Sequence, residues 1–349
     1  MFKKLIQRLQ GYYPALVGLG MFLVSLVLRN FPEQTHQIYR NRLFSGFRWV
    51  HDAIFGYLPF PMIAAVLILG AAAAIYVFFT RRHFYRPFYR PILNILGILI
   101  TWFYITWGFN YSATDVKTML ELSPTTITEN QKTQLLNTSL GFAQAARMLS
   151  DTNAFFHSDA ADMLPAIHSS VREELRRIGF ETPGNVTMRR ISETGWLRRI
   201  GISGIYLPFS GEAHADASYL PLRSWFIMAH EYSHGYGITT EGECDFIAFM
   251  ALKNSGVPEL EYAAWFEMAS SVRMPRADSL AFDSLPAFFR RDLDTLRADI
   301  MKYPPWFGKT ANYTNDLYLK INGIEEGIAS YSLMPSYFIA TGYTQVHSK

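Results

Sequence analysis

The chain has 349 residues, of which 50% are hydrophobic and 15% aromatic, and its formal net charge is +3. No basic stripe with interleaved aromatic residues occurs outside the apolar first third, so composition argues against a nucleic-acid partner. A single cysteine, Cys244, excludes an intramolecular disulfide, so a domain of this chain must be held together by its own core.

The apolar excess lies in three charge-free runs, at residues 12–28, 53–80 and 91–114. Each run is near or above the roughly 17 to 25 residues needed to cross about 30 Å of hydrocarbon. We therefore predict three transmembrane helices, at about 12–28, 55–79 and 91–109. The first run follows a basic start and could instead be a secretory signal, but no small-residue cleavage site follows it, which favours a retained helix.

The orientation of these helices follows from segment 81–90, RRHFYRPFYR, which carries four arginines and no acid. Basic loops of this kind stay in the cytoplasm, and the lysine-rich N-terminus agrees. Several arginines between residues 29 and 52 weaken this asymmetry without reversing it. We expect a multi-pass protein of the cytoplasmic (inner) membrane, with an anchor at 1–112 and an extracytoplasmic domain at 113–349.

The external part is expected to be mostly α with a small β element. Segment 202–213, ISGIYLPFSGEA, is rich in β-branched and aromatic residues and is typical of a strand or hairpin. Apolar residues three and four apart, with breaks at glycine and proline, predict helices at 129–151, 166–181, 221–236, 241–254, 258–273, 279–302 and about 321–340.

One of these helices carries the pattern H-E-x-x-H at His230, Glu231 and His234. Residues i and i+4 share one helix face, so both imidazoles can reach one Zn²⁺ ion, while the glutamate can touch a water on the metal without being a ligand. This arrangement suits peptide hydrolysis, with Glu231 as general base. The alternative is a pair of ordinary surface or core histidines, which the rarity of the full pattern disfavours.

A hydrolytic zinc site needs a third protein ligand, and the candidates are Glu241, Glu243 and Asp245. A straight helix would place them too far along its axis, so the chain must turn back near Gly235 and Gly237. Thr240 and Glu243 have the spacing of a capping box that would start the returning helix.

On that returning helix, Glu241 and Asp245 share a face. We therefore assign Glu241 as third ligand and Asp245 as the carboxylate that orients a ligand histidine. Glu243 is the main rival for the ligand position, because the cap assignment is itself open. Cys244 could be a soft ligand, but a buried small apolar role suits it better.

The H-E-x-x-H and E-x-E-C-D-F-I-A motifs resemble the gluzincin group of zinc metallopeptidases. The chain more closely resembles a bacterial membrane-anchored family catalogued as domain of unknown function 3810. The motifs shared with that family are W-G-F-N-Y at 107–111, G-I-Y-L-P-F-S-G-E-A at 204–213, the H-E-x-x-H block, and N-D-x-Y-L-K-x-N-G with G-x-x-S-Y at 315–331.

The resemblance implies a zincin-like fold with His230, His234 and Glu241 as ligands and Glu231 as base. Where this chain has Cys244 and Asp245, the family commonly has alanine and asparagine. This difference does not change the ligand assignment. The family usually has asparagine at the position of His214. His214 could add a histidine to the site or lie at the surface, and we expect it to lie at the surface.

In zincins an edge strand near the metal pairs with an extended substrate, and 204–209 is the candidate here, with a core strand as the alternative. Tyr318 and Tyr331 are candidates for stabilising an oxyanion, although plain packing is the commoner role of a tyrosine.

These observations predict a membrane-tethered zinc peptidase acting on a peptide or protein substrate. The alternative is a non-catalytic, zinc-stabilised binding or sensor module. Glu231 separates the two, because a structural metal site has no need of a base beside an open coordination position.

Overall fold

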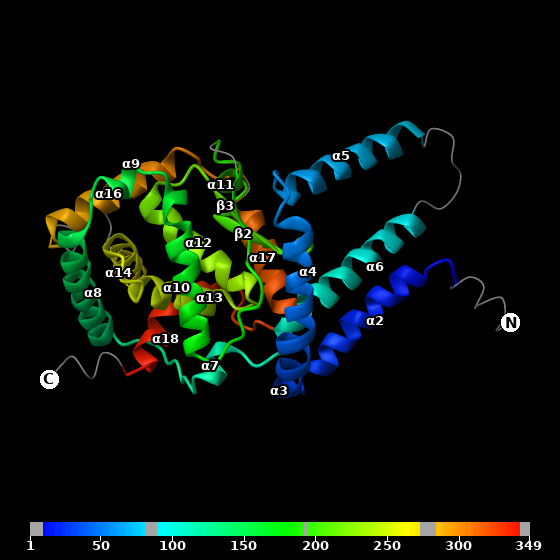
Figure 1. Cartoon of the computed structure of the whole chain (residues 1–349), viewed down its shortest axis with the longest axis horizontal. Helices are drawn as coiled ribbons and strands as arrows, with labels where there is room; N and C mark the ends of the chain where they lie inside the picture. Colours follow the sequence, from blue (N-terminus) through cyan, green and yellow to red (C-terminus); the bar gives the residue numbers. More distant parts are fainter. Residues whose placement is uncertain (1–9, 81–88, 192–193, 273–283, 307, 343–349) are drawn as a thin grey trace. The chain divides into compact units, whose positions relative to one another are not determined.

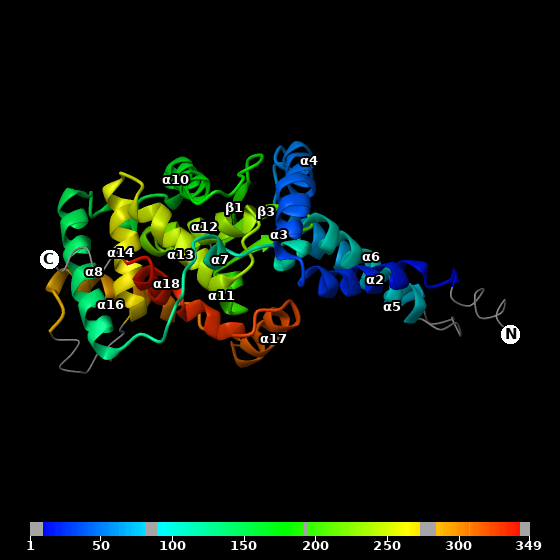
Figure 2. The ribbon, with the colours of Figure 1, turned by 90° about the horizontal axis from the view of Figure 1, so that it is seen from below.

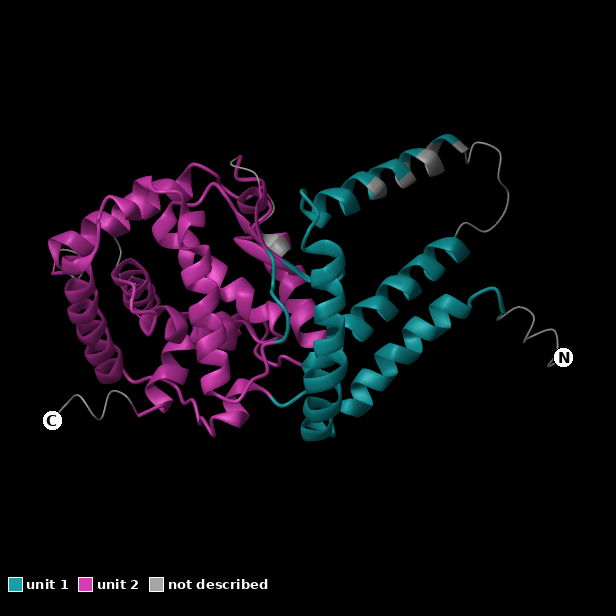
Figure 3. Ribbon diagram, viewed as in Figure 1, with its two compact units in different colours: residues 1–114, 183–187, 207–212 teal, residues 115–182, 188–206, 213–349 magenta. Residues whose placement is uncertain are grey.

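The computed structural model describes residues 10–80, 89–191, 194–272, 284–306 and 308–342. It is mostly helical with one small sheet (Figures 1 and 2). The described residues form two compact units (Figure 3). The first comprises residues 1–114, 183–187 and 207–212, and the second comprises 115–182, 188–206 and 213–349.

The first unit consists of apolar helices and one helical segment with buried polar residues. Its elements are α2 (Tyr13–Leu28), α3 (Pro32–Thr35), the π-helix η1 (His36–Phe44), α4 (Ser45–Phe55), α5 (Met62–Thr80), α6 (Tyr89–Thr106) and the 3₁₀ helix η3 (Gly108–Ser112). Helices α2 and α6 lie side by side. They meet at Gly18 and Gly97, where a Cβ atom on Gly18 would lie 2.6 Å from the Gly97 carbonyl oxygen. Small residues at a helix contact allow this close backbone approach.

Among the described residues, only α6 is long and apolar enough to cross a membrane. Helix α2 and the stretch Met62–Ala72 of α5 are apolar but shorter. Of the three predicted spanning helices, the structure therefore supports one by length and composition, and the other two are not confirmed. The second predicted span also begins too early, because Gly56, Pro59 and Pro61 separate α4 from α5. Residues 1–9 and 81–88, which hold much of the predicted orientation signal, lie outside the described residues.

The second unit is a helical assembly around α13. Its first elements are α7 (Val116–Met119), α8 (Glu129–Leu149), α9 (Ala154–His157), η4 (Ala160–Met163), α10 (Leu164–Arg177) and α11 (Trp196–Arg199). It continues with α12 (Pro221–Gly235), α13 (Glu241–Lys253), α14 (Pro258–Val272), α16 (Ala287–Met301), α17 (Gly308–Ile321), η5 (Gly327–Ser332) and α18 (Met334–Ala340). Helices α10, α12, α14 and α18 all pack on α13, whose middle is buried at Phe246, Ile247 and Phe249.

The small sheet has strand order β1-β3-β2, from β1 (Met188–Ile191), β2 (Gly204–Leu207) and β3 (Glu212–Asp216). β1 runs parallel to β3 in the register Met188 to Ala213. The predicted strand or hairpin at 202–213 corresponds to β2 and the start of β3, and β2 lies at an edge of the sheet. The sequence analysis did not predict β1, whose four residues are too few for a clear alternation.

The C-terminal prediction is wrong in detail. The helix expected at about 321–340 is replaced by η5 and α18, and a helix that was not predicted, α17, precedes them. The physical cause is the pair Gly323 and Gly327, whose positive φ angles of 97° and 56° interrupt an α-helix. The helix expected at 279–302 begins at Ala287, and residues 273–283 lie outside the described part.

Candidate metal centre

Helix α12 carries the H-E-x-x-H residues at its buried C-terminal end. Trp225, Met228 and Ala229 are fully buried and hold the helix inside the unit. The helix then stops in a Schellman motif: the Gly237 N–H donates to the His234 carbonyl at 2.9 Å, and the Ile238 N–H donates to the Ser233 carbonyl at 3.3 Å. Gly237 has the left-handed φ of 94° that this motif requires, whereas Gly235 remains within the helix.

After this turn, α13 begins at Glu241 and packs back along α12. The returning helix starts where the sequence analysis expected, but the capping box does not form. Thr240 occupies the cap position without a side-chain hydrogen bond. The Glu243 carboxylate instead accepts a hydrogen bond from the Lys117 N–H at 2.8 Å. Glu243, the rival third ligand, is thus held by α7.

Three potential ligand atoms converge between the two helices. The two Nε2 atoms of His230 and His234 are 3.1 Å apart, and Oε2 of Glu241 lies 3.1 Å from the first and 3.3 Å from the second. Metal–ligand distances of about 2.0 to 2.1 Å in a tetrahedron place ligand atoms roughly 3.3 Å apart. The described spacing fits three ligands of one such ion.

The far side of each imidazole is held by a hydrogen-bond acceptor. Nδ1 of His230 lies 2.7 Å from Oδ1 of Asp245, and Nδ1 of His234 lies 2.8 Å from the Ile238 carbonyl oxygen. An Nδ1–H that donates to these acceptors leaves the Nε2 lone pair directed at the centre. Because both Nε2 atoms and the carboxylate oxygen are then acceptors, their close approach favours a cation between them.

The electrostatics of the cluster point in the same direction. Burial alone would lower the pKa of His230 and His234, but the carboxylates of Asp245 and Glu241 outweigh it, so both pKa values are raised. Burial opposes ionisation of Glu241, yet the two imidazoles hold its pKa well below the usual range. Side chains of the three residues are only 11 to 12% exposed, so positive charge is favoured in a nearly dry site.

Glu231 lies beside this triad without belonging to it. Burial raises its pKa to about 7, although the two imidazoles oppose the shift. Its Oε2 atom is buried and has no hydrogen-bond partner among the described residues. The other oxygen, Oε1, faces β2, where a Cβ atom on Gly204 would lie only 2.6 Å away. A buried carboxylate oxygen without a hydrogen-bond partner lies here beside a cluster that favours a cation. This environment fits a group that accepts a proton from a water or substrate.

His230, His234 and Cys244 also form a group that could hold a metal ion, with potential ligand atoms within 4.8 Å of one another. The orientation disfavours Cys244, because its Sγ lies 3.3 Å from Nδ1 of His234, the nitrogen directed away from the triad. Burial also raises the pKa of Cys244 far above its usual range, so a neutral thiol is favoured. Glu241 is the better third ligand on geometry.

Tyr331 reaches the cluster from η5. Its ring is parallel to that of His230, with an interplanar angle of 3° and centroids 6.4 Å apart. Although Tyr331 is 42% exposed as a residue, burial of its phenol group and the Glu241 carboxylate raise the pKa of that group, which therefore stays protonated. Tyr318 lies on α17 and is 41% exposed, and its suggested role remains a prediction.

His214 does not lie at the surface as expected. It is fully buried in the central strand β3, with Nδ1 at 3.3 Å from the Ile205 carbonyl oxygen. The expectation was wrong because His214 was judged by the usual exposure of histidine, whereas every residue of β3 is buried.

Two glycines that the sequence analysis did not single out allow this arrangement. Gly204 lets Glu231 lie against β2, and a Cβ atom on Gly242 would lie 2.3 Å from the Ser330 carbonyl oxygen. The absent side chain at Gly242 lets η5 approach α13 and brings Tyr331 over His230. Only a three-dimensional structure can reveal such contacts between distant segments.

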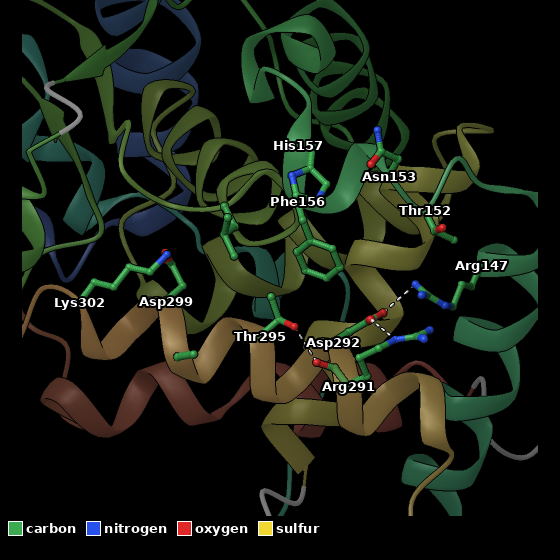
Figure 4. Close-up of a pocket in the computed structure, with 12 residues that line it drawn as sticks. Arg147, Thr152, Asn153, Phe156, His157, Arg291, Asp292, Thr295, Asp299 and Lys302 are labelled. Atoms are coloured by element: carbon green, nitrogen blue, oxygen red, sulfur yellow. Dashed lines mark hydrogen bonds and ion pairs between the residues drawn. The ribbon is translucent and has the colours of Figure 1, made fainter.

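A hollow of about 710 Å³ elsewhere in the second unit is lined mainly from α8, α9 and α16 (Figure 4). His230, His234 and Glu241 are not among the residues that line it. Its buried acid, Asp292, contacts Arg147 at 2.7 Å and accepts the Tyr262 hydroxyl at 2.6 Å, while Asp299 pairs with Arg198 at 3.0 Å. These acids are already paired within the protein, so the hollow is not a second metal site.

Comparison with family models shows which family this chain represents. The family described as "Protein of unknown function (DUF3810)" matches residues 39–339. The chain belongs to the DUF3810 family. Comparison with curated proteins and with solved structures gives no match. DUF3810 membership agrees with the sequence resemblance and by its description carries no activity.

Proposed function

We propose that this DUF3810 protein is a zinc-dependent peptidase tethered to the cytoplasmic membrane. The observation that carries the proposal is the set of three potential ligand atoms from His230, His234 and Glu241 within 3.1 to 3.3 Å of one another, next to the separate carboxylate of Glu231. A structural site would need a closed set of ligands and no adjacent base.

A zinc ion held by the triad would supply a Lewis acid that polarises a peptide carbonyl and lowers the pKa of a water molecule. Glu231 is then the group that accepts a proton and returns it to the leaving amine, because its pKa near 7 suits both directions of transfer. Tyr331, whose phenol stays protonated, is placed to donate a hydrogen bond to a developing oxyanion.

The edge strand β2 supports a peptide as the substrate class. Gly204, at the start of β2, lies directly against Glu231. An extended peptide that pairs with an edge strand gains main-chain hydrogen bonds with little demand on its side chains. A peptide or protein substrate is therefore favoured over a small polar molecule.

The membrane anchor rests on α2, α5 and α6. Helix α6 has the required length, and its glycine contact with α2 is the small-residue packing typical of membrane helices. The basic segment 81–90 favours a cytoplasmic loop between α5 and α6, which leaves the second unit on the extracytoplasmic side.

The decisive experiment compares wild type with Glu231→Gln, using purified full-length protein, a zinc assay and a peptide library. We expect about one zinc per chain in both proteins, with cleavage only by wild type. Zinc in both without any cleavage by wild type would favour the alternative, a zinc-stabilised binding or sensor module. Absence of zinc from folded wild type would reject both.

A further inference from the structure

The continuous helical segment of α3, η1 and α4 has its polarity reversed relative to a helix of a soluble protein. Its buried side carries Arg40, Arg48 and His51, which are 4%, 1% and 4% exposed. Its outer side carries apolar residues that are each more than half exposed: Ile38, Leu43, Trp49, Val50 and Ile54. A surface helix in water normally shows the opposite arrangement.

The buried arginines have partners within the first unit. Arg40 donates to the Thr114 carbonyl at 2.6 Å and to Oδ1 of Asn110 at 3.2 Å. Arg48 pairs with Asp52 and donates to the Gly211 carbonyl at 2.6 Å. The inner side also buries the aromatic residues Tyr39 and Phe44, and its polar side chains bind these backbone carbonyls. The packing of this segment inside the first unit therefore does not explain why its outer side is apolar.

The position of α4 within its unit indicates what covers the outer side. In Figures 1 and 2, α4 crosses the C-terminal ends of α2 and α6 instead of running alongside them. A nearly wholly apolar hollow of about 380 Å³ connects these elements, lined by residues that include Leu28, Ile38, Leu43 and Ile105. The apolar surface of the segment is thus continuous with that of α2 and α6.

We propose that Pro32–Phe55 is an interfacial helix whose outer side lies in the headgroup and acyl boundary of the lipid bilayer. A helix that crosses the end of a spanning pair lies parallel to the membrane plane, where amphipathic helices bury their apolar side. Trp49, at 63% exposure, is of the residue type enriched at this depth, and the exposed Arg42 suits anionic headgroups. The proposal rests on the membrane attachment proposed above, but not on peptidase activity.

Depth-resolved fluorescence quenching tests this proposal with full-length protein in phosphatidylethanolamine and phosphatidylglycerol vesicles. In a Cys244→Ala background, an environment-sensitive label is attached to Trp49→Cys, to Leu23→Cys in α2, or to Met148→Cys in the second unit. All three native residues are exposed, at 63%, 52% and 79%. Ile54→Cys provides a second position on the outer side if Trp49→Cys fails to fold.

We expect lipid quenchers near the headgroup to reduce the fluorescence at Trp49→Cys more than deep quenchers do. Leu23→Cys should respond to deep quenchers, and Met148→Cys only to a water-soluble quencher. If Leu23→Cys responds as expected but Trp49→Cys and Ile54→Cys behave like Met148→Cys, the interfacial helix is disproved and the anchor stands. If Leu23→Cys also behaves like Met148→Cys, membrane attachment itself fails. Labels at 49 and 54 shielded from every quencher would indicate a protein partner and overturn the proposal.

Discussion

Nδ1 of His230 lies 2.7 Å from Oδ1 of Asp245, one helical turn beyond Glu241 on the same helix. This carboxylate fixes the orientation of His230, so its removal should weaken metal binding without removing a ligand. We expect Asp245→Ala to lower zinc affinity by about 10- to 100-fold, as found for such outer partners. Competition with a chromophoric chelator measures the affinity. Asp294→Ala, at an exposed position on α16, is the matched control, and an equal effect at both positions would refute a specific role for Asp245.

The identity of the third ligand can be tested at three neighbouring positions. Glu241→Ala should reduce zinc affinity by more than the roughly 10- to 100-fold expected for an outer partner. Glu243→Gln and Cys244→Ala should keep zinc, because Glu243 binds the Lys117 N–H and Cys244 lies on the far side of His234. Zinc content after dialysis against a weak chelator decides the matter. Retention by Glu241→Ala together with loss by Cys244→Ala would show that the ligand set is His-His-Cys.

Gly204 is expected to position Glu231, the proposed catalytic base. A Cβ atom there would lie 2.6 Å from Oε1 of Glu231 and 2.8 Å from the His214 carbonyl oxygen, so Gly204→Ala must displace one of them. We expect kcat to fall by about a hundredfold, the cost of moving a catalytic group by roughly 1 Å, with zinc affinity unchanged. Gly141→Ala, where a Cβ atom meets nothing within 4 Å, is the control. Wild-type kcat in Gly204→Ala would contradict this role.

His168 should make the stability of the second unit depend on pH. Burial, with help from Arg172, lowers the pKa of His168 from 6.5 to about 4, and its Nε2 lies 2.6 Å from the Tyr236 hydroxyl. A depressed histidine pKa means that the unfolded chain binds the proton first. The contribution of neutral His168 to the free energy of unfolding is therefore fully present above pH 6.5 and is lost as the pH drops toward 4. The free energy of unfolding should fall by up to about 2 kcal/mol between pH 7 and pH 5.

Urea unfolding of wild type and His168→Gln at several pH values measures this dependence. The variant should lose the part of the pH dependence that His168 contributes while retaining an acceptor for the tyrosine hydroxyl. Identical pH profiles for the two proteins would mean that His168 titrates normally.

Asp292 is expected to be required for the stability of the second unit because it neutralises Arg147, although burial raises the pKa of the Asp292 carboxyl. It is fully buried, contacts Arg147 at 2.7 Å and accepts the Tyr262 hydroxyl. Asp292→Ala leaves the mostly buried guanidinium of Arg147 without its counter-ion, so the free energy of unfolding should fall by about 3 kcal/mol. Thermal and urea unfolding measure the loss, and the exposed Asp294→Ala again serves as control. A loss below that of the control would refute a stabilising pair.

Local patterns in the sequence determined the part of the candidate site that lies on two consecutive helices. The spacing of His230 and His234 places them on one face, and Gly237 predicts the reversal, because helix periodicity and left-handed glycine are properties of a few neighbouring residues. The same periodicity places Asp245 one turn from Glu241.

Tertiary structure alone decided which residues complete or surround that cluster. Tyr331 reaches His230 only because Gly242 admits η5, Glu243 turns to Lys117, and His214 is buried by the sheet. The sequence also did not predict that the outer side of α3, η1 and α4 is apolar, because a sequence does not reveal which face of a helix binds backbone carbonyls. Contacts between distant segments depend on packing of the whole chain, which short-range periodicity does not encode.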